Sequence, residues 1–240
     1  MLENLDIFVL TCDKSIHCCD IFQKVYIHTK HPDSKVYFLG YKKPEFTLLE
    51  NFYFISLNLT DPGPKCTKYI NNFFKSYNKS HFILTVDDLI PVVQNNELSN
   101  KIYKFIFNEK DVGRYALSHD VSINTQTTFY KNCDEIDYIK VNDSSVYKLS
   151  LVWSVWHKNF FLDNLIDDQD LWEFETIQND KCKLDKFNVY STKHYNDSFI
   201  DFSHLYKRGK FRKNTHMYSS YSQTLIDNSY KKIIDDSLNL

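Results

Sequence analysis

The stretch FILTVDD, residues 82–88, decides how the rest of this chain is interpreted. Residues 82–86 are all apolar or β-branched, which is typical of a buried strand, and Asp87 and Asp88 follow at the end of that strand. Adjacent carboxylates repel each other unless a cation or a cluster of hydrogen-bond donors lies between them, and a hard divalent cation shared with a diphosphate meets that need. The alternative is that one acid caps a following helix while the other is solvated, and for an isolated pair that alternative is preferred.

The residues before this stretch alternate between strand-like and helix-like patterns. Three further runs are rich in strand-forming residues: 5–11 (LDIFVLT), 35–41 (KVYFLGY) and 52–58 (FYFISLN). Residues 15–30 carry apolar side chains at helical spacing, and so do residues 69–77. Strands that alternate with helices predict an α/β fold with a parallel sheet and helices on both faces.

The pattern becomes less regular after this stretch. Residues 97–107 predict another helix. Three later runs look like strands of a mixed or antiparallel portion: residues 115–122, 127–131 and 137–141. In such a sheet, ligands bind beyond the carboxyl ends of the strands, where the strand order reverses. Two polar clusters fall at strand ends, residues 11–14 and the Asp87-Asp88 pair, so we expect the ligand site there.

Length, charge and cysteine content limit the class of protein. With 42% hydrophobic and 16% aromatic residues, the chain is predicted to form a single folded domain over residues 1–240. A net charge of -2 creates no overall field that would draw the protein to nucleic acid or to an anionic membrane. None of the 6 cysteines forms a CxxC pair, and no apolar run approaches the roughly 18 residues of a spanning helix. We expect reduced thiols, no membrane span and a cytoplasmic location.

Two later stretches complete a family resemblance. Residues 151–161 (LVWSVWHKNFF) and 171–175 (LWEFE) follow the VDDLIP segment at residues 86–91 in an order typical of type-A fold glycosyltransferases. Over residues 5–212 the chain resembles this family, particularly its small members from bacteria and large DNA viruses. The resemblance implies a Rossmann-like fold with a mixed central sheet. It also implies transfer of a sugar from a nucleoside diphosphate sugar to a carbohydrate or other hydroxyl acceptor, with Mn2+ or Mg2+ at the diphosphate.

The family holds its cation with an acid-x-acid motif at the end of the fourth strand, which corresponds here to Val86, Asp87 and Asp88. The resemblance makes Asp88 the principal metal ligand and lets Asp87 reach the ribose, the sugar or a metal-bound water. Val86 departs from the motif because an aliphatic side chain cannot ligate a metal, and some enzymes of this fold work without a cation.

The resemblance also implies a pocket for the nucleoside. Thr11 and Asp13, at the end of the first strand, would line it, and Tyr41, after the second strand, would stack on the base. The alternatives are a turn with a helix N-cap for the first two residues and a core position for Tyr41.

Aromatic and acidic residues of the later stretches are candidates for the acceptor site. Trp153 and Trp156 are three residues apart, which places them on one face if the segment is helical. The resemblance puts them, with Trp172, at the acceptor pocket, and an ordinary aromatic core is the alternative. An inverting reaction needs a carboxylate to take the acceptor's proton. The family's Trp-x-x-Glu pattern places this carboxylate at Glu175, with Glu173 as the substitute. A surface acidic loop is the alternative interpretation of this stretch. A retaining enzyme of the same fold needs no such base.

Two segments near the C-terminus complete the list of candidates. Residues 204–213 form a dense basic run, in which the resemblance supports Arg208 or Lys210 as the group that closes over the donor's diphosphate. Contact with nucleic acid and a solvated loop are the alternatives. Residues 224–238 place apolar side chains on one stripe and charges of both signs outside it, which predicts a helix docked on the domain or on a partner.

Two other functions use similar features. A nucleotidyltransferase also places paired acids, metal and nucleotide at the edge of an α/β sheet, but it is expected to carry a glycine-rich phosphate loop after its first strand. Residues 11–14 (TCDK) contain no glycine. A catalytically silent nucleotide-sugar-binding module is the other alternative, because Val86 stands where the family has an acid.

Overall fold

The computed structural model describes residues 1–29, 34–57, 65–119, 121, 125–182, 184, 186–204, 206–207 and 210–211. The strands of these residues are β1 (Ile7–Leu10), β2 (Val36–Gly40), β3 (Phe52–Ser56), β4 (His81–Val86), β5 (Leu89–Gln94), β6 (Val112–Ala116), β7 (Thr127–Cys133), β8 (Ile136–Val141), β9 (Ser154–His157), β10 (Asn188–Thr192), β11 (Ile200–His204), β12 (Tyr206–Lys207) and β13 (Lys210–Phe211). The α-helices are α1 (Ile16–Tyr26), α2 (Thr67–Ser76), α3 (Asn96–Asn108), α5 (Lys158–Asn164) and α6 (Leu171–Glu175), and the 3-10 helices are η1 (Leu2–Asn4), η2 (Gln178–Lys181) and η3 (Tyr195–Asp197).

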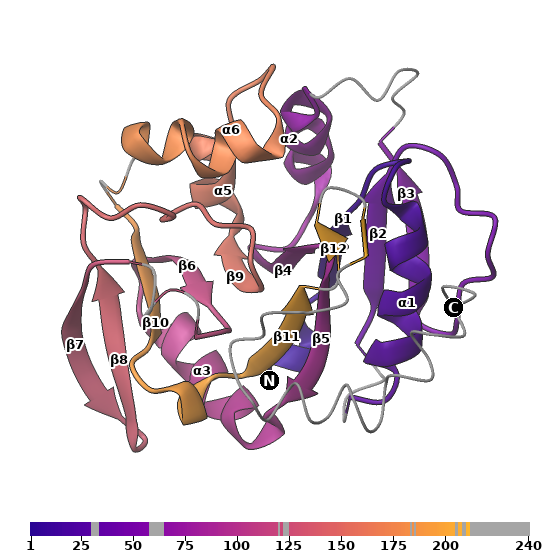
Figure 1. The fold of residues 1–240 in the computed structure, drawn as a ribbon. Coiled ribbons are helices and arrows are strands. Elements are labelled where there is room, and N and C mark those ends of the chain that lie inside the picture. The colour runs from indigo at the N-terminus through magenta and orange to yellow at the C-terminus, as the bar shows by residue number, and fades with distance from the viewer. Residues whose placement is uncertain are drawn as a thin grey trace.

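A mixed central sheet organises these elements. Within the described part of the chain it has nine strands in the order β3-β2-β1-β4-β9-β6-β10-β8-β7. The strands from β3 to β4 run parallel, and β9 lies antiparallel between β4 and β6. The chain adds β2 and β3 on one side of β1 and then returns to place β4 on the other side, so the strand order reverses between β1 and β4 (Figure 1).

The sheet is buried on both faces, which explains why its central strands are apolar without alternation. In β1, Ile7 and Val9 join one core cluster, whereas Phe8 and Leu10 join the other. Side chains of α1 and α3 belong to the first cluster. Side chains of α2, α5 and α6 belong to the second, and Figure 1 shows these three helices gathered together above the sheet. The predicted α/β fold, a mixed sheet with helices on both faces, is confirmed.

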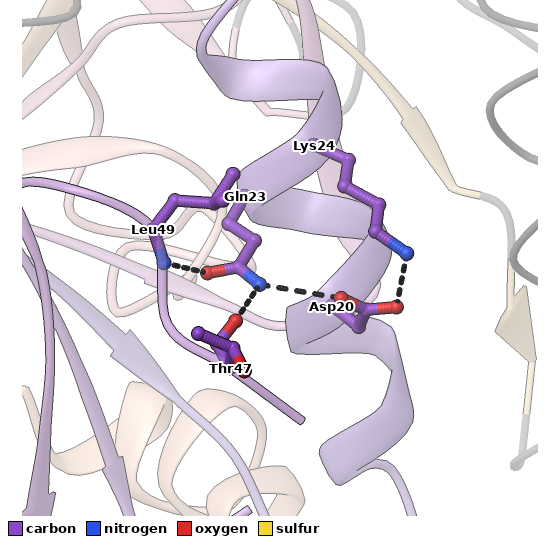
Figure 2. A network of polar contacts seen from close by, with 5 residues as sticks. All are labelled: Asp20, Gln23, Lys24, Thr47 and Leu49. Atoms are coloured by element: carbon purple, nitrogen blue, oxygen red, sulfur yellow. Dashed lines mark hydrogen bonds and ion pairs between the residues drawn. The ribbon is translucent and has the colours of Figure 1, made fainter.

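A polar network fixes the connection between β2 and β3 to α1 (Figure 2). The amide of Gln23, which is buried, donates through Nε2 to the Thr47 carbonyl oxygen at 3.0 Å and accepts through Oε1 from the Leu49 backbone N–H at 3.0 Å. The same Nε2 donates to Asp20, whose carboxylate also pairs with Lys24 at 2.6 Å. A buried amide is stable when both of its ends are hydrogen-bonded in this way.

The structure corrects two expectations about local structure. No helix follows the acid pair, because Leu89 begins strand β5, so neither acid is a helix cap there. Residues 153–161 do not form a single helix either, because strand β9 is followed directly by α5. Trp153 and Trp156 therefore point to opposite faces of the sheet, one into each core cluster.

Two further expectations concern the ends of the chain and the membrane. The helix predicted over residues 224–238 lies outside the described residues. Among the residues that are described, no helix has the length and apolar content needed to cross a membrane.

Candidate functional site

A cavity of about 510 Å³ opens at the carboxyl ends of β1, β2 and β4. The residues that line it are Leu10, Thr11, Cys12, Asp13, Lys14, Ser15, Tyr41, Cys66, Val86, Asp87, Asp170 and Leu171. It lies where the strand order reverses between β1 and β4, which is where open α/β sheets bind their ligands. Its volume also falls within the range of about 300 to 1,000 Å³ that is usual for small-molecule sites.

Asp87 is the buried acid of this cavity. Only 5% of its surface is exposed, and its Oδ2 accepts hydrogen bonds from the Thr11 and Ser15 hydroxyl groups, each at 2.5 Å. Burial raises the pKa of the Asp87 carboxyl to about 7, while the two hydroxyl donors oppose the rise and the neighbouring Asp88 adds to it. The loop after β1 therefore orients a carboxyl group that gains or loses its proton near neutral pH.

Asp88 faces a different partner. Its Oδ2 lies 2.8 Å from Nε2 of His204, and it is absent from the residues that line the cavity. The contact depends on strand pairing, because β11 runs antiparallel to β5 and sets His204 opposite Leu89. The sequence marks His204 only as the start of a basic run, and no local pattern links it to Asp88. The two adjacent acids thus have separate surroundings, one inside the cavity and one beside an imidazole.

The three residues expected at a nucleoside pocket do lie together. Thr11, Asp13 and Tyr41 all line the cavity, although they come from the ends of two different strands. Asp13 accepts a hydrogen bond from the Lys42 backbone N–H at 3.3 Å, which fixes the acid toward the end of β2. Burial raises the pKa of the Tyr41 phenol, so this side chain is neutral at physiological pH. Its ring and hydroxyl are therefore available as an uncharged surface on the cavity wall.

The N-terminus of α6 contributes an acid that the sequence marks only as part of the acidic stretch before Trp172. Asp170 lines the cavity and caps the helix: its Oδ1 accepts from the Glu173 backbone N–H at 2.7 Å, and Glu173 Oε2 accepts from the Asp170 N–H at 2.9 Å. Glu175 Oε1 accepts from the Leu151 backbone N–H at 2.6 Å. Neither glutamate lines the cavity. An Asp followed by Glu three residues later is the capping-box signature that could have marked this position.

The tryptophans expected at the acceptor pocket divide into two groups. Trp153 and Trp156 have no exposed surface, and Trp153 Nε1 donates to the Leu89 carbonyl oxygen at 3.0 Å. A side chain without exposed surface cannot contact a substrate, so both rings are core residues and their acceptor assignment is wrong. Trp172 is different, because 66% of its surface is exposed and it directly follows Leu171, which lines the cavity.

The basic run is only partly described. Arg208 lies outside the described residues, and for Lys210 the structure describes only its place as the first residue of β13. The expectation that one of them closes over a diphosphate therefore stays a prediction. Lys14 is the basic residue on the cavity lining that the structure does describe.

Comparison with known proteins gives a low likeness in fold. No protein-family model matches the sequence, and no curated protein sequence matches it. The chain is similar to the crystal structure of S. aureus TarS 1-349, with 14% identity over 80% of this chain and 61% of that chain and a TM-score of 0.48. It is also similar to apo-UDP-glucose pyrophosphorylase, with 6% identity over 95% of this chain and 99% of that chain and a TM-score of 0.46. HddC from Yersinia pseudotuberculosis is similar with 12% identity over 80% of this chain and 92% of that chain and a TM-score of 0.40. The chain thus spans about three fifths of the TarS structure, and likenesses of this size carry no functional argument.

Proposed function

We propose that this chain is a glycosyltransferase that moves a sugar from a nucleoside diphosphate sugar to a hydroxyl group of a carbohydrate or another acceptor. The observation that carries the proposal is the cavity at the reversal of strand order, with Asp87 and Asp170 on its wall. The family resemblance of the sequence supports the same activity.

The donor's nucleoside fits the part of the cavity between β1 and β2. Tyr41 offers an uncharged ring on which a base can stack, and Thr11 and Asp13 offer oxygens that accept hydrogen bonds from base or ribose groups. Asp87 lies deeper, at the end of β4, in reach of the sugar or ribose hydroxyls in this proposal. The diphosphate would then face Lys14, with Arg208 or Lys210 as additional cationic groups.

A divalent cation stays part of the proposal. Asp88 Oδ2 and His204 Nε2 are both atoms that ligate metals, and they lie 2.8 Å apart. The described residues contain no group of three or more His, Cys, Asp or Glu that could hold a metal ion. The remaining ligands for Mn2+ or Mg2+ would therefore come from the donor's diphosphate and from water. Such a cation supplies positive charge to the departing diphosphate.

The cation requirement can be measured directly. We expect EDTA to suppress sugar transfer and added Mn2+ to restore it, with Asp88→Asn and His204→Asn each raising the Mn2+ concentration needed for half-maximal rate. Lys104→Met serves as a control, because this lysine on α3 is exposed and does not line the cavity. Full activity in EDTA would remove the cation from the proposal and leave the sugar transfer itself intact.

Asp170 is the carboxylate best placed to take the acceptor's proton in an inverting reaction. In this step the acceptor oxygen forms a bond to the anomeric carbon, its proton passes to the carboxylate, and the bond from that carbon to the diphosphate breaks. Asp170 faces the cavity, whereas Glu175 is bonded to the Leu151 backbone and does not. Glu175 and Glu173 stay the alternatives for this role. Trp172, exposed beside Asp170, provides a surface on which an acceptor sugar can stack.

The base assignment is tested by three matched substitutions. Asp170→Asn should lower turnover by about 10²- to 10⁴-fold, which is the usual contribution of a general base. The fold should persist because Asn caps helices as well as Asp does. Glu175→Gln and Glu173→Gln should retain turnover within a few-fold. A large loss of turnover in Glu175→Gln or Glu173→Gln, with Asp170→Asn still active, would assign the base to the substituted glutamate. If NMR shows that the product retains the donor's anomeric configuration, the reaction requires no such base.

The activity itself is tested by product analysis. The protein is incubated with UDP-, GDP- and dTDP-sugars, and separately with nucleoside triphosphates and sugar 1-phosphates. Slow release of nucleoside diphosphate and free sugar from one donor supports a glycosyltransferase. Release of pyrophosphate from a triphosphate would establish a nucleotidyltransferase, and binding of a donor without any turnover would establish a silent binding module.

A further inference from the structure

A second cavity, of about 540 Å³, lies where β8 ends and β10 begins, and it shares no lining residue with the first. The polar residues that line it are Lys140, Asp143, Lys148, Asp180, Cys182 and Asn188. The proposed transferase activity uses none of them.

Lys148 is the buried cation of this cavity. Only 5% of its surface is exposed, and its Nζ donates to the Asp143 carbonyl oxygen at 2.5 Å. In the described part of the chain its ammonium group forms no ion pair with a carboxylate. An ammonium group removed from water without an anionic partner is costly, and a bound anion would offset that cost. The surroundings of Lys148 therefore indicate an anionic ligand.

The backbone around Lys148 is held in place before any ligand binds. The Lys148 backbone N–H donates to Asn179 Oδ1 at 2.6 Å, and Asn179 Nδ2 donates to the Ser145 carbonyl oxygen at 3.0 Å. Asn179 is itself buried. A fixed cationic group loses little conformational entropy on binding, which favours a preformed site.

The other lining groups narrow the class of ligand. Lys140, on β8, adds a second ammonium group that forms no ion pair with the described residues. Burial raises the pKa of the Cys182 thiol to about 11, so it stays neutral and does not compete as an anion. Asp143 and Asp180 expose carboxylates that repel a bare anion but accept hydrogen bonds from hydroxyl groups.

We propose that this cavity is a binding site for a small phosphate ester that carries hydroxyl groups, with the phosphate on Lys140 and Lys148 and the hydroxyls on Asp143 and Asp180. Phosphate oxygens are strong acceptors for ammonium donors. Polyol hydroxyls can donate to both carboxylates, whereas a phosphate dianion held by the two lysines offers a single hydroxyl donor. Glucose 6-phosphate has both parts and is a suitable probe.

The test is isothermal titration calorimetry of the full chain with glucose 6-phosphate, glucose and inorganic phosphate. We expect glucose 6-phosphate to bind more tightly than either of the others. Lys148→Met and Lys140→Met should each weaken binding by about tenfold or more, since each removes a charged hydrogen-bond donor. The exposed Lys104 on α3 gives the matched control, because Lys104→Met should leave the affinity unchanged. If Lys148→Met fails to fold by circular dichroism, Lys140→Met decides.

Three results would overturn the proposal. The first is the absence of glucose 6-phosphate binding, and the second is an affinity that both lysine variants retain. The third is equal affinity for inorganic phosphate, which would exclude the role given to the two aspartates. Tyr41→Ala separates the two cavities: loss of glucose 6-phosphate binding in this variant, with the lysine variants unaffected, would place the ligand in the first cavity and contradict the assignment.

Discussion

The carboxylate of Asp87 is held in the interior by two hydroxyl donors, and its raised pKa makes it a source of instability at neutral pH. Since its pKa is about 7 in the folded protein and about 3.9 in an unfolded chain, the folded state binds the proton more tightly, and stability falls as pH rises from about 4 to 7. Asp87→Asn removes the charge and keeps an oxygen that accepts from Thr11 and Ser15. We expect a melting temperature higher by about 2 °C or more at pH 8, a smaller gain at pH 5, and loss of sugar transfer.

Differential scanning calorimetry of both proteins in EDTA, at pH 5 and pH 8, measures this effect without a contribution from bound cations. Asp13→Asn is the matched control, because Asp13 lies on the same cavity but is less buried. A lower melting temperature of Asp87→Asn at pH 8 would show that the ionised carboxylate stabilises the fold.

The indole of Trp153 connects the core to the acid pair. Its Nε1 donates to the carbonyl oxygen of Leu89, the residue after Asp88, and its ring stacks on Phe22. Trp153→Phe keeps an aromatic ring but leaves that buried carbonyl without its donor, which should cost about 1 to 3 kcal/mol in the free energy of unfolding. Urea denaturation measures the loss. Trp172→Phe, at an exposed position, should change stability by less than about 0.5 kcal/mol. Equal stability of the two variants would contradict the core assignment of Trp153.

At the scale of elements, the pairing of β4 with β9 sets His81 opposite His157. Burial, and then the neighbouring His157, lowers the pKa of His81 to about 4, and burial also lowers the pKa of His157. The folded state therefore binds fewer protons than the unfolded chain in mild acid. The contribution of the neutral His81 to the free energy of unfolding is fully present above pH 6.5 and is lost as the pH falls toward 4. We expect His81→Asn to reduce the fall in melting temperature between pH 7 and pH 5.

The exposed Lys104 on α3 provides the comparison, because a lysine does not titrate between pH 5 and pH 7. Lys104→Met should show the same fall in melting temperature as the unmodified protein. If His81→Asn also shows an unchanged fall, the acid sensitivity of the protein arises elsewhere than in the β4–β9 pair.

At the scale of the whole molecule, both core clusters depend on the same strands. Phe8 and Val9 are adjacent in β1 but belong to different clusters, so neither cluster can be lost while the sheet stays intact. We expect one cooperative unfolding transition, as predicted for a single domain. Tryptophan fluorescence of a Trp172→Phe variant, which reports on Trp153 in one cluster and Trp156 in the other, should share its midpoint with far-ultraviolet circular dichroism. Two separated midpoints would show that the chain contains two independently folding units.

The sequence by itself determined the strands and helices from β1 to β4, because these elements depend on local patterns of side chains, whereas β5 and β9 were not predicted. The apolar run at residues 82–86 became β4, and residues 97–107 fell within α3. The rule that parallel strands end at a common edge also located the cavity, with Thr11, Asp13 and Tyr41 on its lining.

Only the tertiary structure decided which of these groups meet. Asp87 and Asp88 are adjacent in the sequence, yet one accepts from Thr11, 76 residues away, and the other contacts His204, 116 residues away. The same holds for Trp153, whose burial follows from its place beside β9, and for Asp170, which reaches the cavity through the position of α6. Strand pairing and helix packing fix such contacts, and because they join residues far apart in the chain, no pattern of neighbouring residues encodes them.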